Sequence, residues 1–396
     1  MHTRNIFLGI LFLLGCLSIN AKVPEKQIPI LAWYSIPPEY TSIDRYQEMK
    51  DAGFTLGFSH TEKSSDVARA LDIADKVGIK LIITCKDLID DTENTVRRFK
   101  THPALAGYFL RDEPNVTEFK ELAEWARRIE AADSKHFCYL NLFPTYATKE
   151  QLKTDSYTDY VRQFIKEVNL PFISYDHYPV INDYELRPDF YENLGIISGE
   201  ARRSNKPFWA FALSTPHGSY PMPTLATLRL EVFSDLAYGA QGIEYFTYFT
   251  PKSDEWNFHQ GPISENFRRT SVYDMVKQVN QEIKDLSPIF LGSRLISVTH
   301  SGKDIPQGTT RFTRVNGPFS DVSTEDAGAV ISVLENEGTY YLVIVNRDVK
   351  KSQKITVRGG TAIYRVLKDG TSVPASVYDS TLLVDPGDIL IYKWND

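Results

Sequence analysis

Two adjacent acids, Asp112 and Glu113, are the residues of this chain best suited to catalysis. They follow Leu105–Leu110, an apolar run that predicts a buried strand, and precede Val116–Ala132, which has the period of an amphipathic helix. Burying one carboxylate beside another is unfavourable unless the site uses their coupled charge, so the pair suggests proton transfer. Capping of the following helix would explain one acid, but it accounts less well for two acids preceded by Arg111.

The elements that must position these acids alternate between strand and helix. We expect eight strands, at Pro29–Ser35, Phe54–Ser59, Ile79–Cys85, Ala106–Leu110, Phe137–Leu142, Phe172–Asp176, Phe208–Leu213 and Gly242–Tyr248. Helical patterns separate them, at Ile43–Ala52, Ser65–Val77, Thr92–Thr101, Val116–Ala132, Lys149–Val168, Tyr184–Ser204 and Thr224–Tyr238, and Ser271–Ile283 follows the last strand. This count predicts an α/β fold, a (β/α)8 TIM barrel over residues 22–290. A doubly wound open sheet would need a glycine-rich turn after its first strand, which residues 33–38 lack.

Residues 291–396 have a different pattern, in which helical periodicity disappears. Short alternating runs such as Thr339–Asn346 and Asp388–Trp394 are separated by turns such as Lys368–Gly370. We expect a small C-terminal antiparallel β-sandwich.

In a barrel of this kind, the carboxyl ends of the strands form the site. Each polar or aromatic residue at these ends has a structural explanation when taken alone, so the prediction depends on their meeting at one face. The residues predicted there are Trp33, Tyr34, His60, Lys86, Arg111, Asp112, Glu113, Asn141, Tyr175, Asp176, His177, Glu244, Tyr245 and, in the following loop, Trp256.

Acids, amides and aromatic rings suit the cleavage of glycosidic bonds. That reaction needs a protonated carboxylic acid at the leaving oxygen and a second group that stabilises the oxocarbenium-like transition state. We expect Glu113 to be the general acid/base, because a negative Asp112 beside it would help to keep it protonated. The expected partner is a poly- or oligosaccharide, and no cofactor is expected.

Two segments resemble known enzymes. Gly107-Tyr-Phe-Leu-Arg-Asp-Glu-Pro114 resembles the strand-four motif of (β/α)8 glycoside hydrolases. Tyr238–Tyr248 resembles strand eight of the β-galactosidase-like members found in Bacteroidetes. In clan A of these enzymes strand four ends in Asn-Glu, so the resemblance implies that Glu113 is the acid/base, with Asp112 in place of the asparagine. The clan's nucleophile is a glutamate that ends strand seven, and Phe208–Thr215 contains none.

Three residues could supply the missing second group. Glu244 lies within strand eight, where a buried structural acid is the alternative explanation. Asp176 ends strand six and is better placed at the mouth of the barrel. Asp112 itself could serve, because an Asp-Glu pair on strand four resembles substrate-assisted exo-β-N-acetylgalactosaminidases, in which the substrate's 2-acetamido group is the nucleophile. This reading implies a β-N-acetylhexosaminidase, with Tyr175 or Tyr245 bonding the acetamido oxygen.

Other functions are less well supported by the sequence. A catalytically inactive, glycan-binding barrel is the main rival, because the strand-seven glutamate is missing. A net charge of −7 without a basic block argues against a nucleic-acid partner. There is no CxxC or HExxH motif for zinc and no Gly-x-Ser-x-Gly elbow for an esterase.

The first 21 residues predict an export signal, with a basic start and an apolar stretch at Ile6–Leu14 that is too short to span a bilayer. Cleavage after Ala21 is one reading. The other is a bacterial lipoprotein signal, in which Cys16 of Leu13-Leu-Gly-Cys16 carries a lipid anchor. We therefore expect a periplasmic or surface-anchored protein without a transmembrane segment, and the sequence leaves its oligomeric state open.

Overall fold

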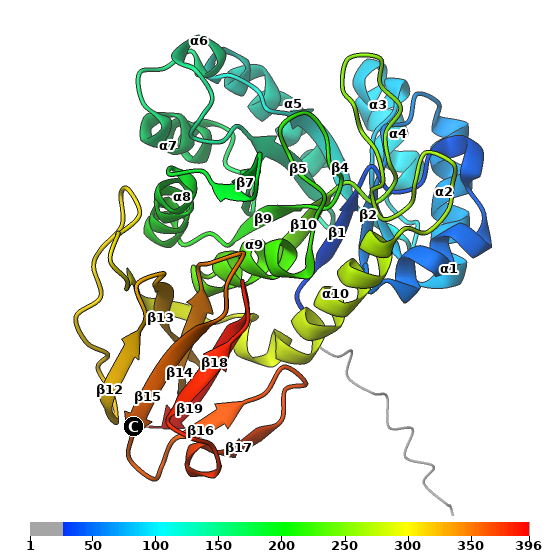
Figure 1. Ribbon diagram of the computed structural model, residues 1–396. Coiled ribbons are helices and arrows are strands. Elements are labelled where there is room, and N and C mark those ends of the chain that lie inside the picture. The colour runs from blue at the N-terminus through cyan, green and yellow to red at the C-terminus, as the bar shows by residue number, and fades with distance from the viewer. Residues whose placement is uncertain (1–26, 396) are drawn as a thin grey trace, which may run out of the picture.

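In the computed structural model, which describes residues 27–395, eight parallel strands close into a barrel (Figure 1). The strand order around the barrel is β1-β10-β9-β6-β5-β4-β3-β2. The strands are β1 (Ile30–Trp33), β2 (Leu56–Phe58), β3 (Lys80–Ile83), β4 (Leu105–Asp112), β5 (Phe137–Leu142), β6 (Ile173–Tyr175), β9 (Phe208–Leu213) and β10 (Gly242–Phe246). The predicted (β/α)8 class is confirmed, while the predicted export signal and Cys16 lie outside the described residues.

Helices surround the barrel and connect its strands. They are α1 (Ile43–Asp51), α2 (Ser64–Val77), α3 (Lys86–Asp90), α4 (Thr92–Phe99), α5 (Phe119–Ala132), α6 (Lys149–Leu152), α7 (Tyr157–Glu167), α8 (Phe190–Ser204), α9 (Leu225–Ala237) and α10 (Ser271–Phe290), with the 3-10 turns η1 (Pro38–Tyr40) and η2 (Val116–Glu118).

Two of these connections differ from the sequence prediction. The helix expected over 149–168 is split, because Lys153 adopts a left-handed conformation (φ 58°) and Ser156 caps a new helix. The helix expected from Tyr184 begins only at Phe190. Before it, β7 (Val180–Ile181) and β8 (Glu185–Leu186) form a small hairpin.

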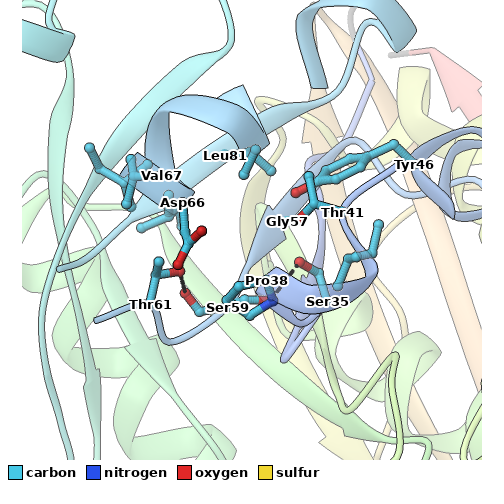
Figure 2. A pocket seen from close by; sticks show the side chains of 14 residues that line it. Ser35, Pro38, Thr41, Tyr46, Gly57, Ser59, Thr61, Asp66, Val67 and Leu81 are labelled. Atoms are coloured by element: carbon cyan, nitrogen blue, oxygen red, sulfur yellow. Dashed lines mark hydrogen bonds between the residues drawn. The ribbon is translucent and has the colours of Figure 1, made fainter. Parts of the chain in front are cut away.

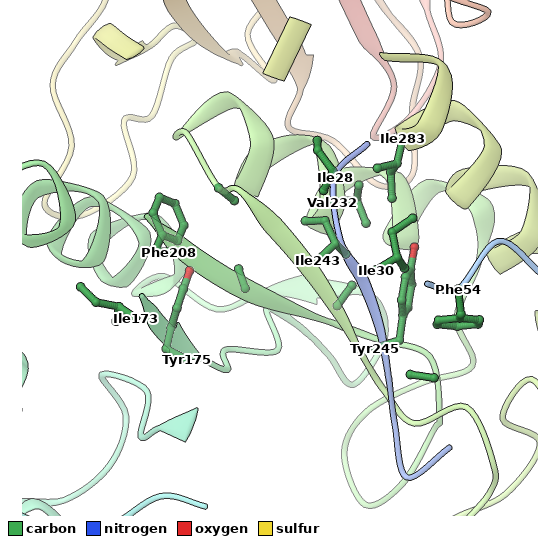
Figure 3. Close-up of a cluster of buried hydrophobic side chains, with 14 of the residues drawn as sticks. Ile28, Ile30, Phe54, Ile173, Tyr175, Phe208, Val232, Ile243, Tyr245 and Ile283 are labelled. Carbon is green, nitrogen blue, oxygen red and sulfur yellow. The ribbon is translucent and has the colours of Figure 1, made fainter. Parts of the chain in front are cut away.

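Side chains alternate along each barrel strand between the helix layer and the barrel interior. Figure 3 shows the outward set, in which Ile30, Ile243 and Tyr245 pack with Val232 of α9 and Ile283 of α10. This alternation decides which residues of a strand can reach a site at the barrel mouth.

The inward set forms a separate core inside the barrel. Trp33 packs there on Phe58 and Phe211, with ring centroids 4.6 and 5.4 Å apart. Lower in the barrel, Phe172 stacks on Trp209 at 4.2 Å. The barrel is therefore filled with side chains, and open space begins only above this core.

Antiparallel sheets follow α10, as the sequence predicts. One sheet has the order β11-β13-β14-β19-β16-β17 and the other β12-β15-β18. The strands are β11 (Arg294–His300), β12 (Phe319–Thr324), β13 (Ala329–Asn336), β14 (Thr339–Asn346), β15 (Gln353–Gly359), β16 (Tyr364–Val366), β17 (Ser372–Pro374), β18 (Thr381–Val384) and β19 (Ile389–Asn395), with η3 (Ala375–Val377) between β17 and β18.

The sandwich is fixed to the outer side of the barrel through α9. Arg229 of α9 is buried and pairs with Glu282 of α10 (Nε to Oε2, 3.0 Å), and its Nη1 lies 3.6 Å from Asp388 Oδ2 before β19. Tyr238 also shares a 2.7 Å hydrogen bond with His300 of β11. These contacts involve the helix layer, so the C-terminal sheets leave the barrel mouth open.

Candidate active site

The backbone at the end of β4 directs two consecutive acids toward the mouth of the barrel. The pairing of β4 with β5 shifts register between Phe109 and Arg111, which marks an irregularity in the strand. Glu113 then adopts a left-handed conformation (φ 46°), and its N–H donates to the carbonyl of Asn141 at 2.9 Å. A non-glycine residue in this conformation is uncommon and often found at functional sites.

The two acids do not cap the helix that follows them. Asn115 does so: its side chain accepts from the Thr117 N–H at 3.0 Å, and Glu118 accepts from the Asn115 N–H at 3.0 Å. The capping explanation for Asp112 and Glu113 therefore fails, because other residues satisfy the helix start.

The acids of β4 join a third acid, Asp176, which follows β6. The carboxyl group of Glu113 lies beside that of Asp176, and each shifts the pKa of the other. Asn141 of β5, the strand between β4 and β6, donates its amide N–H groups to Asp176 Oδ1 at 2.8 Å and to Asp112 Oδ1 at 3.2 Å. Three adjacent strands thus supply one cluster of three acids bridged by an amide.

Their environment separates the protonation states of these acids. The pKa of Glu113 is raised well above its usual range. The largest cause is removal from solvent, followed by the charges of Asp176 and Asp112 and then by hydrogen bonding to Asp176. Removal from solvent and the charge of Asp112 also raise the pKa of Asp176, while the bonds it accepts, from Asn141 among others, oppose this rise. The pKa of Asp112, whose carboxyl borders the open pocket, rises to about 6 through partial removal from solvent, opposed by the bond from Asn141. Among the three acids, Glu113 therefore keeps its proton to the highest pH.

A pocket of about 340 Å³ opens above this cluster. Its acidic side comes from β4, β5 and β6. Most of its aromatic residues come from β1, β9, β10 and the loops after them, whereas Tyr146 and Tyr178 follow β5 and β6. The lining residues are Trp33, Asp112, Glu113, Asn141, Tyr146, Asp176, Tyr178, Phe211, His217, Tyr220, Phe246, Trp256 and Phe258. A sugar ring stacked on the aromatic side would face the acids.

Six of the predicted site residues line this pocket: Trp33, Asp112, Glu113, Asn141, Asp176 and Trp256. Glu244 lies directly below it, fully buried, with its carboxyl bonded to Tyr139 and Ser174. It is therefore not exposed to a substrate in the pocket.

The other predicted residues do not line the pocket. Tyr175 and Tyr245 are neighbours of inward-facing residues on their strands, so the alternation directs both into the helix layer. His177 is buried against Tyr146 and Phe190, with Nε2 3.5 Å from Asp189. The remaining four residues also lie outside the pocket lining. Tyr34 is half-buried against the core, and His60 lies against Trp33. Lys86 begins α3, and Arg111 is exposed and pairs with Glu118 at 2.8 Å.

The sequence analysis did not select several aromatic residues of the pocket. Tyr178, Phe211 and Phe246 could have been found from strand alternation, because each is two residues from an inward-facing position on its own segment. Tyr146, Tyr220 and Phe258 come from connecting loops, and no local pattern marks the direction in which a loop folds back.

Figure 2 shows a second, smaller cavity beside β1 and β2, lined by Ser35, Gly57, Ser59 and Thr61 among others. Its volume of about 20 Å³ is enough for a water molecule and too small for a sugar.

Within residues 27–395, no group of three or more His, Cys, Asp or Glu side chains could hold a metal ion. The helices of the same part of the chain are too short or too polar to cross a membrane.

Comparisons with known proteins agree with this arrangement. A family model for β-galactosidases, Glyco_hydro_42, matches residues 141–286, from β5 through α10. The match includes Asp176 and Glu244 but stops short of Glu113. Among curated protein sequences, none matches this chain.

Solved structures share the fold at low sequence identity. The β-galactosidase Gan42B of G. stearothermophilus has a TM-score of 0.64 at 10% identity, over 93% of this chain and 98% of its own. The β-galactosidase of Bacillus circulans sp. alkalophilus has a TM-score of 0.61 at 9% identity, over 93% and 99%. The chain spans only 60% and 58% of the β-galactosidases of Marinomonas ef1 and Halorubrum lacusprofundi. The chain thus shares the (β/α)8 barrel fold of these β-galactosidases, and its residues 141–286 match the β-galactosidase family model.

Proposed function

We propose that the pocket hydrolyses a glycosidic bond of a poly- or oligosaccharide, with Glu113 as the general acid/base. The observation that carries the proposal is the contact of Glu113 with two further acids, Asp112 and Asp176, inside an aromatic-lined pocket, where their charges raise the pKa of Glu113. Cleavage begins when a protonated acid donates to the leaving oxygen, and this contact keeps that proton on Glu113. The aromatic side would hold the sugar ring while the departing oxygen meets the acid.

The same contact bears on the second catalytic group. Retaining hydrolases separate their two carboxyl groups by about 5–5.5 Å and inverting hydrolases by about 6.5–9.5 Å. Glu113 and Asp176 follow β4 and β6, which flank β5, so both carboxyl groups lie on the same side of the pocket. Asp176 is therefore better placed to keep Glu113 protonated and to return a proton to it, or to orient a substrate group. It is less well placed to attack from the opposite face of the sugar.

This geometry favours, as a second candidate, a substrate-assisted reaction on a 2-acetamido sugar. The substrate would supply the nucleophile that the opposite wall lacks, and Asp112 or Asp176 would orient its acetamido N–H. Tyr178 and Tyr146 line the pocket and could donate to the acetamido oxygen, in place of Tyr175 and Tyr245. Because solved structures with this fold are β-galactosidases, plain β-galactosides are the first alternative substrates to test.

The test compares Glu113→Gln with wild type on matched aryl glycosides, with and without a 2-acetamido group. Glu113→Gln should lose turnover by at least about 100-fold, the usual contribution of a general acid. Glu121→Gln, the same change at an exposed position of α5 outside the pocket, is the matched control. Full activity of Glu113→Gln would refute the assignment, and wild-type binding without turnover on any glycan would favour an inactive, glycan-binding barrel.

Preference for the 2-acetamido series, with inhibition by a thiazoline mimic, would support the substrate-assisted candidate. Efficient hydrolysis of a plain galactoside would count against it.

Export and lipidation at Cys16 stay proposals of their own. They predict that a clickable fatty acid labels the full-length protein in cells and that Cys16→Ser abolishes this labelling.

A further inference from the structure

A buried polar cluster lies below the pocket, inside the barrel. Glu244 of β10 contacts Tyr139 of β5 through Oε1 (2.6 Å) and Ser174 of β6 through Oε2 (2.7 Å). Tyr139 and Ser174 are themselves 2.9 Å apart, and all three side chains are 0% exposed. Ser174 continues upward to the side-chain oxygen of Asn141 at 3.0 Å. The cluster thus connects a buried acid to the amide that bridges the pocket acids.

The pocket acids determine how the Asn141 amide is turned. Its nitrogen faces Asp112 and Asp176, and two carboxyl groups that accept hydrogen bonds require donors on that side. Its oxygen must then face Ser174, which is the donor that the described residues provide for it. Ser174 has a single proton, and this bond uses it.

A count of protons now fixes the state of Glu244. With the Ser174 proton given to Asn141, the 2.7 Å contact between Ser174 and Glu244 can be a hydrogen bond only if Glu244 is the donor. Tyr139 donates to the other oxygen of Glu244. An ionised Glu244 would leave either this contact or the Asn141 oxygen without a proton, among side chains that are at most 3% exposed.

We propose that Glu244 is a positioning residue that carries a proton, donates it to Ser174, and through Ser174 holds the Asn141 amide against Asp112 and Asp176. The consequence for catalysis depends on the proposed function, whereas the protonation of Glu244 does not. The charged groups that act on Glu244 from β4 and β6 are Asp112 and Asp176, both acids, and the salt bridges of the described residues include none to Glu244. Burial first, and these two charges less strongly, raise the pKa of Glu244 to about 8, against the bond from Tyr139.

The protonation is tested directly by infrared difference spectroscopy of wild type minus Glu244→Gln at neutral pH. A glutamine can accept from Tyr139 and donate to Ser174, so it reproduces the bonds of a protonated acid and should fold. The expected difference is the loss of one carbonyl band of a protonated carboxylic acid. Loss of the two carboxylate bands instead would overturn the proposal, whether or not the protein turns over a substrate.

The positioning role is tested with an aryl glycoside that the wild type cleaves. Ser174→Ala should lower kcat on the order of tenfold, the effect of losing one orienting hydrogen bond. It should also move the acidic limb of the kcat/KM profile to higher pH, because the Asn141 bond holds down the pKa of Asp176. Glu244→Leu should do the same, and Glu244→Gln should restore both. A folded Glu244→Gln as impaired as Glu244→Leu would contradict the role, and absence of wild-type turnover would contradict only the proposed function.

Discussion

Replacing Asp176 by asparagine should move the protonation of Glu113 in a predictable direction. The charge of Asp176 and the hydrogen bond it accepts both keep the proton on Glu113. A like charge at such a distance raises a carboxyl pKa by about 1–3 units, a tenfold to thousandfold effect on the protonation equilibrium. Asp176→Asn removes the charge and keeps the shape, so the pKa of Glu113 should fall by an amount in this range.

The direction follows from the state that catalysis needs. Glu113 must be protonated to donate, so activity persists below its pKa and is lost as the pH rises through it. The alkaline limb of kcat/KM against pH should therefore shift to lower pH in Asp176→Asn. A carbon-13 NMR titration of carboxyl-labelled glutamate reads the same pKa without requiring turnover. Asp183→Asn, at an exposed position in the β7–β8 turn, should leave both readouts unchanged. An unmoved limb, or one shifted to higher pH, would refute the coupling of the two acids.

Three further substitutions probe the binding surface and the scaffold. Trp256 lines the pocket and is 50% exposed, so Trp256→Ala should raise KM about two- to tenfold with little change in kcat, measured by steady-state kinetics. An added Cβ at Gly107 would lie 2.5 Å from the Phe137 carbonyl oxygen, so Gly107→Ala should lower the free energy of unfolding by about 1–3 kcal/mol. An added Cβ at Gly195 would meet no atom nearer than 4.0 Å, so Gly195→Ala should not lower it. Burial raises the pKa of Glu231 from 4.5 to about 8. As the pH rises between these two values, the unfolded chain has released this proton and the folded chain has not, so the free energy of unfolding falls by up to about 1.4 kcal/mol per pH unit. Glu231→Gln should flatten that slope in urea titrations.

The barrel could be predicted because its sequence signals are local and repeated. Each strand is a short apolar run, and each is followed by an amphipathic stretch, so count and order alone define the closed sheet. The order also determines which strand ends are neighbours. Asp112, Asn141 and Asp176 end or follow three consecutive strands, and the structure brings their side chains within hydrogen-bond distance.

Side-chain direction was harder to predict from single residues. Tyr245 and Glu244 are adjacent in the sequence, and only one of two adjacent strand residues can point into the barrel. Glu244 does, and Tyr245 therefore packs against Phe54 in the helix layer, with ring centroids 5.6 Å apart. Tyr146 and Tyr220 belong to loops whose paths depend on contacts distant in sequence, so no local pattern could assign them to the pocket.

Among the described residues, the pocket wall opposite the acids carries no carboxyl group. Strand β9 ends at Leu213, whose N–H donates to the buried Glu231 of α9 at 2.7 Å, so the acid near this strand faces the helix layer. Ser214 and Thr215 follow and donate to the carbonyl of Thr247 at 2.9 and 3.1 Å, which closes the wall with uncharged groups. On the proposed function, a nucleophile opposite Glu113 would come from water or from the substrate itself, and a measured preference for or against a 2-acetamido sugar would distinguish these two sources.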